Sequence, residues 1–97
     1  MPDSLNIALD FDGTFDRAPA LWAQFIVNAR AAGHTVMIVT ARKAGDRSDI
    51  HEFLFRHDVQ LPVFCTAHGS KLAFCREHGI RIDIWIDDDP TTLVRGH

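Results

Sequence analysis

The sequence of 97 residues has only two cysteines, Cys65 and Cys75, and no Cys-x-x-Cys pair. Two thiols do not make a disulfide framework, so we expect reduced cysteines that pack in the core of a cytoplasmic protein. No apolar run approaches the ~18–20 residues of a membrane span. The first residues also lack the basic segment that precedes the apolar part of a secretory signal. We therefore expect no membrane partner.

Internal repeats, low-complexity tracts and linker-like stretches are also absent from the sequence. A chain of 97 residues is long enough for one domain with a core and too short for two, so residues 1–97 are predicted to form a single domain. The formal net charge is only −3. This mild acidity disfavours charge-driven binding of nucleic acids over a broad surface, although it allows a local basic patch.

Four short apolar segments are present, at residues 5–9, 35–39, 61–66 and 82–86. The second is almost continuously apolar and β-branched, which is typical of strands covered on both faces, as in a parallel sheet. The third contains Pro62, which favours an edge strand or the start of a strand. Each segment is therefore predicted to be a strand.

Three segments with helical apolar spacing alternate with these strands. The first has Pro19 at its start and Gly33 after its end. Ser48 is expected to cap the second helix, and Ser70 the third, which Gly79 closes. This alternation predicts an α/β fold, a small open parallel sheet with helices on both faces. It does not predict the order of the strands.

Hydroxyl and carboxylate side chains follow three of the four predicted strands. Asp10 and Asp12 follow the first, Thr40 ends the second, and Asp87 and Asp88 follow the fourth. Because ligands of open parallel sheets bind beyond the carboxyl ends of the strands, we expect these residues to meet in one site. Clustered carboxylates repel one another unless a cation neutralises them, and hard oxygen donors suit Mg²⁺. The pattern predicts a Mg²⁺ site and a phosphorylated substrate.

The basic residues near these strand ends are either solvated surface cations or cations that bind an anion. Lys71, one of only two lysines, lies at the start of the third predicted helix, where it opposes the helix dipole. A solvated lysine is the ordinary alternative, but the electrostatic conflict favours a specific anionic partner. Arg42, Lys43 and Arg47 follow Thr40 and are either solvated loop cations or an additional phosphate clamp. The acidic segment at residues 10–14 likewise has an ordinary alternative as a polar turn.

Four segments resemble, in order, the sequence motifs of the haloacid dehalogenase (HAD) superfamily. They are Asp10-Phe11-Asp12-Gly13-Thr14, Val39-Thr40, Lys71 and Ile86-Asp87-Asp88. The resemblance spans residues 5–90 and implies a Rossmann-like core and a Mg²⁺-dependent phosphatase, a hydrolase of phosphomonoesters. Few residues separate the motifs from the predicted helices, so the chain resembles the capless type without an inserted cap domain. Water must then be excluded by a large substrate or by a partner subunit, such as a homo-oligomer.

The resemblance also implies a role for each residue. Asp10 would be the nucleophile that forms an aspartyl-phosphate, and Asp12 the general acid and base. Thr40 would hydrogen-bond the phosphoryl group, and Lys71 would neutralise its charge. The metal ligands would be Asp10, the backbone carbonyl of Asp12, Asp87 and Asp88. Of the last two, Asp88 is favoured as the direct ligand, with Asp87 as the partner of Lys71 or a ligand through water.

Thr40-Ala41-Arg42 is similar to the Thr-Gly-Arg segment in the phosphatase domains of polynucleotide kinases. Arg42 would then bind substrate, and a nucleic-acid end or a nucleotide becomes a candidate substrate beside a phosphorylated small molecule. Two other functions stay open, a phospho-accepting signalling domain of the receiver type and a catalytically idle HAD-like binding module. The receiver type fits the order of the motifs less well, since its lysine should follow the last strand.

Overall fold

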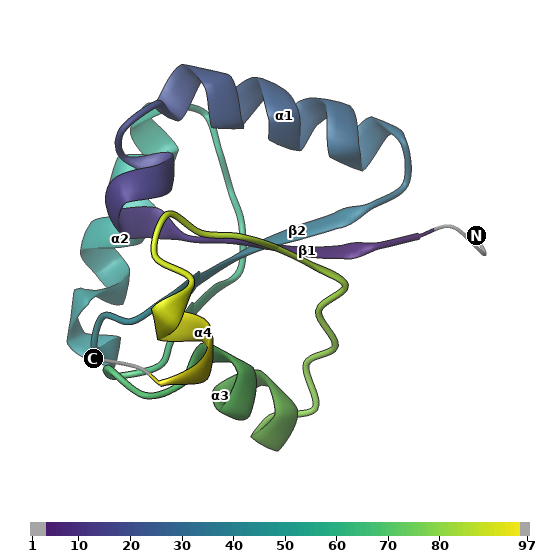
Figure 1. The fold of residues 1–97 in the computed structure, drawn as a ribbon. Coiled ribbons are helices and arrows are strands. Elements are labelled where there is room, and N and C mark those ends of the chain that lie inside the picture. The colour runs from purple at the N-terminus through teal and green to yellow at the C-terminus, as the bar shows by residue number, and fades with distance from the viewer. Residues whose placement is uncertain (1–3, 96–97) are drawn as a thin grey trace.

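Four parallel strands form the centre of the fold in the computed structural model, which describes residues 4–95. The strands are β1 (Asn6–Leu9), β2 (Thr35–Thr40), β3 (Val63–Cys65) and β4 (Ile84–Ile86), and their order in the sheet is β3-β2-β1-β4 (Figure 1). Leu9 of β1 is aligned with Ile38 of β2 and with Ile86 of β4. The structure confirms the predicted α/β fold with an open parallel sheet.

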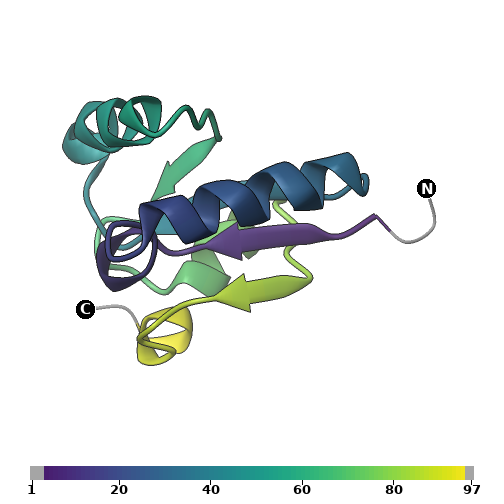
Figure 2. The same cartoon turned by 90° about the horizontal axis from the view of Figure 1, so that it is seen from above.

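Helices cover both faces of this sheet (Figures 1 and 2). Helices α1 (Pro19–Ala31) and α2 (Arg47–Arg56) pack on one face. Helix α3 (Lys71–Glu77) packs on the other face, beside the short helix α4 (Thr91–Val94). None of the helices within residues 4–95 is long and apolar enough to cross a membrane.

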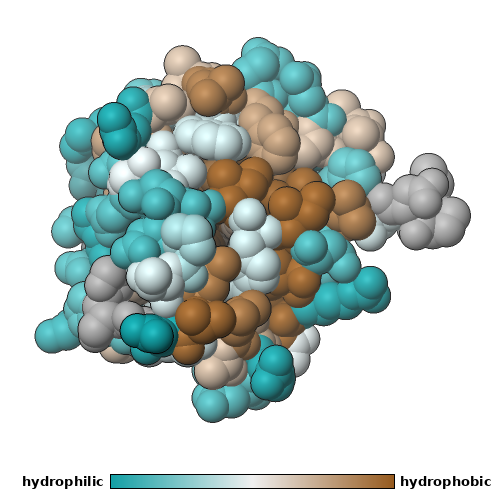
Figure 3. All heavy atoms as spheres, in the orientation of Figure 1, coloured by the Kyte–Doolittle hydropathy of each residue, from teal (hydrophilic) through white to brown (hydrophobic). Residues whose placement is uncertain are grey.

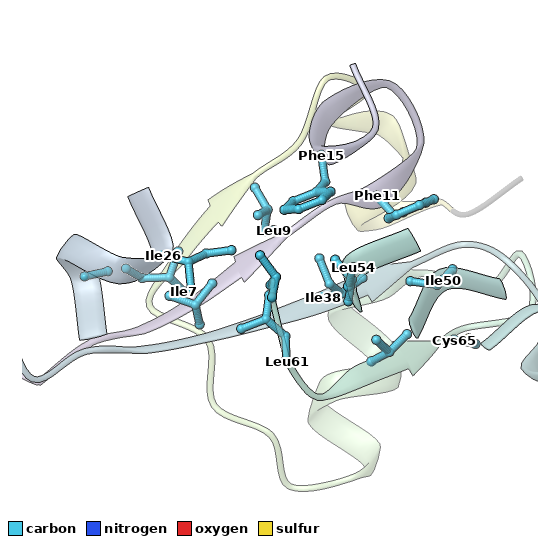
Figure 4. Packing of buried hydrophobic residues seen from close by; sticks show 14 residues of the cluster. Ile7, Leu9, Phe11, Phe15, Ile26, Ile38, Ile50, Leu54, Leu61 and Cys65 are labelled. Atoms are coloured by element: carbon cyan, nitrogen blue, oxygen red, sulfur yellow. The ribbon is translucent and has the colours of Figure 1, made fainter. Parts of the chain in front are cut away.

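The alternation of side chains along the central strands divides the core into two parts. In β2, Val36 and Ile38 face α1 and α2, whereas Met37 and Val39 face α3. Successive side chains of a strand point to opposite faces, so a strand buried on both sides is apolar at every position. Figure 4 shows the larger part, where residues of β1 and β2 meet Ile26, Ile50 and Leu54 of the helices; the labelled set is Ile7, Leu9, Phe11, Phe15, Ile26, Ile38, Ile50, Leu54, Leu61 and Cys65.

The predicted boundaries are mostly confirmed. Helix α1 begins at Pro19, and the Ser70 side chain caps α3 by accepting a hydrogen bond from the Ala73 amide at 3.2 Å. Strand β3 begins after Pro62 and is an edge strand, as its proline predicted. The prediction for Ser48 is wrong, because the single turn η2 (Ala44–Asp46) runs directly into α2, which begins at Arg47. Ser48 therefore lies inside the first turn.

The strand order explains where a site can form. From β1 the chain builds outward through β2 to β3, and α3 then returns it to β4 on the opposite side of β1. The carboxyl ends of β1 and β4 therefore flank the point at which the topology reverses, where open α/β sheets form a crevice. A single wide turn, η1 (Phe11–Phe15), joins β1 to α1, and residues 66–70 join β3 to α3. Neither connection contains an inserted cap domain.

Candidate functional site

Three carboxylates meet at the carboxyl ends of β1 and β4. Oxygen atoms of Asp10, Asp87 and Asp88 lie within 4.8 Å of one another. The approach follows from the sheet, since the Asp10 amide donates to the Ile86 carbonyl at 2.9 Å and extends the β1–β4 pairing by one residue. Asp10 is buried and Asp88 is exposed. We call these three residues the acidic cluster.

Lys71 lies beneath the acidic cluster and is almost fully buried, with 1% of its surface exposed. Its Nζ atom donates to Oδ1 of Asp10 at 2.8 Å and to Oδ2 of Asp87 at 2.6 Å. Lys71 therefore pairs with Asp87, one of the two roles predicted for that residue, whereas the role of Lys71 toward a phosphoryl group stays a prediction. The Ser70 hydroxyl, which donates to the Leu93 carbonyl at 2.8 Å, ties the start of α3 to α4.

The electrostatics of the cluster act most strongly on Asp10. Burial raises the pKa of Asp10 to about 7, because the ionised carboxyl loses its hydration. The ammonium group of Lys71 opposes this rise, while Asp88 and Asp87 add to it. Lys71 thus pairs with two of the three carboxylates, those of Asp10 and Asp87, and a bound cation would favour the ionised form of Asp10.

Two hydroxyl groups complete the cluster. Thr14 Oγ1 lies 3.2 Å from Oδ1 of Asp88 and 3.5 Å from Oδ2 of Asp10, and Thr92 Oγ1 lies 3.3 Å from Oδ2 of Asp87. Neither threonine was predicted from the sequence to belong to the site. Thr14 belongs to the acidic segment at residues 10–14, which was a usable signal, whereas Thr92 comes close only through the turn into α4.

Asp12 and Gly13 form the turn that leaves β1. Their backbone angles, φ −71° and ψ 122° at Asp12 and φ 83° and ψ −8° at Gly13, are those of a type II turn, which favours glycine at its third position. A Cβ atom on Gly13 would lie only 2.8 Å from the carboxyl carbon of Asp88. Glycine is thus needed here both for the turn and for the close approach of Asp88.

The carboxylate of Asp12 pairs with Arg42 and is not part of the acidic cluster. Arg42 donates from Nε to Oδ2 at 2.8 Å and from Nη2 to Oδ1 at 2.7 Å. The hydrogen bond to Asp12 raises the pKa of Arg42. The guanidinium group also lies 5.2 Å from the centre of the Phe11 ring. This two-pronged ion pair was not expected from the sequence, and the substrate-binding role of Arg42 stays a prediction.

Thr40 is fully buried at the end of β2, and its Oγ1 accepts a hydrogen bond from the Arg42 amide at 3.3 Å. Ala41, the next residue, lines the cavity above the acidic cluster. The role of Thr40 toward a phosphoryl group therefore stays a prediction. Lys43 and Arg47 are exposed. Cys65 and Cys75 are free and buried, as expected.

A cavity of about 220 Å³ opens above these residues and is lined by, among others, Asp10, Asp12, Lys71, Asp87, Asp88 and Thr92. We call it the acidic cavity. Its hard oxygen donors fit a small divalent cation such as Mg²⁺. Asp87 accepts from Lys71 and from the Asp89 amide, and Asp10 also accepts from Lys71, so the exposed Asp88 is the most available donor. A larger cavity of about 580 Å³ beside α2 includes none of the predicted site residues.

No protein-family model, curated protein or solved structure matches this chain.

Proposed function

We propose that this protein is a Mg²⁺-dependent phosphatase that hydrolyses a phosphomonoester through an aspartyl-phosphate on Asp10. The resemblance to the HAD motifs supports the proposal. One observation carries it furthest: buried Asp10 pairs with buried Lys71 at 2.8 Å, within the acidic cluster at the ends of two adjacent parallel strands. A carboxylate nucleophile, a cation beside it and further oxygen donors are what transfer of a phosphoryl group to an enzyme requires.

In the first step, an oxygen of Asp10 attacks phosphorus and the bond from phosphorus to the ester oxygen breaks. Asp12 pairs with Arg42 as a carboxylate in the structure, so in this proposal it takes up a proton as Arg42 turns to the substrate phosphate. It then gives this proton to the departing alkoxide, which leaves as an alcohol. The Lys71 ammonium group, already in contact with Asp10, stabilises the negative charge that spreads over the phosphoryl oxygens. The product of this step is an acyl phosphate on Asp10.

In the second step, water attacks the same phosphorus and the bond to Asp10 breaks. Asp12, now a carboxylate, takes a proton from the attacking water, so it is protonated again at the end of this step. Inorganic phosphate leaves and Asp10 is restored. The position of Asp12 on the wall of the acidic cavity, two residues after Asp10, supports this double role.

The Asp10 and Asp88 carboxylates and the Asp12 backbone carbonyl would hold Mg²⁺, with Asp87 contributing through Lys71 or through water. When bound, the ion would supply positive charge against the carboxylates and the phosphoryl oxygens. The proposed substrate is a phosphorylated small molecule or a nucleic-acid end, and Arg42 and Thr40 are proposed to contact it. Because no cap covers the acidic cavity, we also propose that a large substrate or a second copy of the chain excludes water. Free, buried cysteines accord with the proposed cytoplasmic location.

The test is incubation of the protein with Mg²⁺ and p-nitrophenyl phosphate, followed by release of nitrophenol. We expect steady turnover that stops on chelation of Mg²⁺ and in the Asp10→Asn variant, whose fold is checked by circular dichroism. A stable, stoichiometric aspartyl-phosphate would instead indicate a phospho-accepting domain of the receiver type. No phosphoryl transfer at all would indicate a binding module, and either result would overturn the proposal.

A further inference from the structure

A second cavity adjoins the acidic cavity beside the start of α1. Its volume is about 350 Å³, and Arg17, Leu21, Trp22 and Ile86 are among its lining residues. Asp87 and Asp88 line both cavities. The Asp87 side chain is buried against Lys71, so Asp88 is the exposed residue on the border between the two cavities. We call this second space the Trp22 cavity.

The walls of the Trp22 cavity are largely apolar. Leu21 is 61% exposed, although it is a large hydrocarbon side chain. Trp22 is half-buried, and its ring stands nearly perpendicular to that of Phe25, at 83° and with 5.7 Å between the ring centres. This contact holds the indole, so the cavity has an aromatic wall before any ligand binds. Figure 3 shows apolar surface continuing over the neighbouring edge strand β4.

The two cavities differ in volume, and their volumes fit different parts of a phosphate ester, the phosphoryl group and the organic group. The acidic cavity, at about 220 Å³, has room for a phosphoryl group and a cation but not also for the organic part of an ester. The Trp22 cavity, at about 350 Å³, has a volume that is usual for small-molecule sites. Both cavities are bordered by Asp88, so an ester with its phosphoryl group in the first would extend its organic group toward the second.

The charges around the Trp22 cavity indicate which organic group fits. Arg17 and Asp88 carry opposite charges on the lining and offset each other, whereas Leu21, Trp22 and Ile86 favour a group that is apolar. We propose that the Trp22 cavity binds the organic group of the substrate and that this group is uncharged and aromatic. The inference rests on the phosphatase function proposed above and specifies the substrate class of the same site.

The test compares hydrolysis of benzyl phosphate and ethyl phosphate in the presence of Mg²⁺. Both esters release simple alkoxides, so a difference in kcat/KM reports mainly on the aromatic ring. We expect kcat/KM for benzyl phosphate to be at least about tenfold higher, the size of effect that an apolar pocket supplies. 2-Carboxyethyl phosphate is expected to be a poorer substrate than benzyl phosphate, because its carboxylate would lose hydration against the apolar walls even though Arg17 attracts it.

Two variants on α1 separate this cavity from general surface effects. Leu21→Ser should bring kcat/KM for benzyl phosphate close to that for ethyl phosphate. Val27→Ser is the matched control, because Val27 is equally exposed, at 60%, and lies outside the Trp22 cavity. It should keep the preference for the aromatic ester. Trp22→Phe should retain more of the preference than Trp22→Ala, because phenylalanine preserves an aromatic wall.

The outcomes distinguish this inference from the proposed function. Equal kcat/KM for benzyl and ethyl phosphate, or preference for the carboxylate ester, would overturn the inference and leave the phosphatase function standing. If no ester is hydrolysed, the phosphatase function fails, and calorimetric binding of benzylphosphonate and methylphosphonate then decides about the cavity. The inference about the Trp22 cavity is supported if benzylphosphonate binds more tightly than methylphosphonate and the Leu21→Ser variant loses this difference. Equal binding of the two phosphonates would overturn it.

Discussion

The carboxyl group of Asp88 lies where a side chain on Gly13 would begin. A Cβ atom at Gly13 would be 2.8 Å from Cγ and 2.9 Å from Oδ1 of Asp88. The two residues are far apart in sequence, yet the missing side chain of one makes room for the carboxylate of the other. The turn after β1 and the turn after β4 therefore depend on each other.

Gly13→Ala should weaken Mg²⁺ binding and lower stability. Alanine at φ 83° is strained by about 1–2 kcal/mol, and its methyl group would displace the Asp88 carboxylate from the acidic cluster. The measurements are urea unfolding without Mg²⁺ and calorimetric titration with Mg²⁺. Gly45→Ala is the control, since no atom lies within 4 Å of a Cβ there. Unchanged Mg²⁺ affinity in Gly13→Ala would contradict the role of the close approach.

Lys71→Met should be one of the most destabilising single substitutions in the chain. It leaves Asp10 and Asp87 without their buried cation, and breaking a buried ion pair in this way costs about 3–5 kcal/mol. Denaturant unfolding measures the loss. Lys43→Met, at an exposed lysine, should have little effect. Adding Asp10→Asn to Lys71→Met should restore part of the stability, and a double variant no more stable than Lys71→Met would contradict the electrostatic explanation.

Without divalent cations, the free energy of unfolding should fall as the pH rises from about 4 to about 7. Asp10 has a folded pKa of about 7 against 3.8 for the free side chain, so the folded state binds its proton more tightly. The stabilisation is therefore complete below pH 3.8 and is lost as the pH rises through 7. The measurement is denaturant unfolding in EDTA across this pH range, for the protein and for the Asp10→Asn variant. The free energy of unfolding of the variant should change with pH by a few kcal/mol less. Parallel profiles for the two proteins would show that the Asp10 carboxyl is not responsible.

Mg²⁺ should stabilise the protein more at pH 8 than at pH 5, because it binds the ionised cluster. The midpoint of thermal unfolding with and without Mg²⁺ measures this. Chelation should leave the fold intact, since the core lies on both faces of the sheet and does not depend on the ion. Asp88→Asn should remove most of the Mg²⁺ effect, whereas Asp49→Asn on the exposed side of α2 should not. Unfolding on chelation would mean that the ion is structural.

Arg42→Gln should affect catalysis more than stability. The Arg42–Asp12 pair is partly exposed, so its loss should cost no more than about 1 kcal/mol. Asp12 would lose the guanidinium group that fixes its position, and kcat/KM for ethyl phosphate should fall at least about tenfold. p-Nitrophenyl phosphate, whose leaving group needs no proton, should be affected less. Arg47→Gln is the control, and an equal loss for both esters would contradict a role through Asp12.

Much of the fold follows from local patterns in the sequence. Apolar residues at every position of 35–39 predict a strand buried on both faces, and Val36, Met37, Ile38 and Val39 do alternate between the two parts of the core. Pro19 and Ser70 mark helix starts because a proline ring and a serine hydroxyl act on their immediate neighbours. The prediction that Ser48 caps the second helix was wrong, because the preceding turn η2 continues directly into α2. A single serine does not reveal such a continuation.

For the candidate site, the sequence alone determined which side chains stand at the ends of strands, because the period of a strand and the turn residues after it are local properties. It thereby predicted that Asp10, Asp12, Thr40, Asp87 and Asp88 meet, and the structure brings the carboxylates of Asp10, Asp87 and Asp88 together. Only the tertiary structure decided the pairing of partners: Lys71 between Asp10 and Asp87, Arg42 on Asp12, and Asp88 against Gly13. The reason is that these contacts join residues 16 to 75 positions apart, and they exist only because the sheet places β2 and β4 on either side of β1.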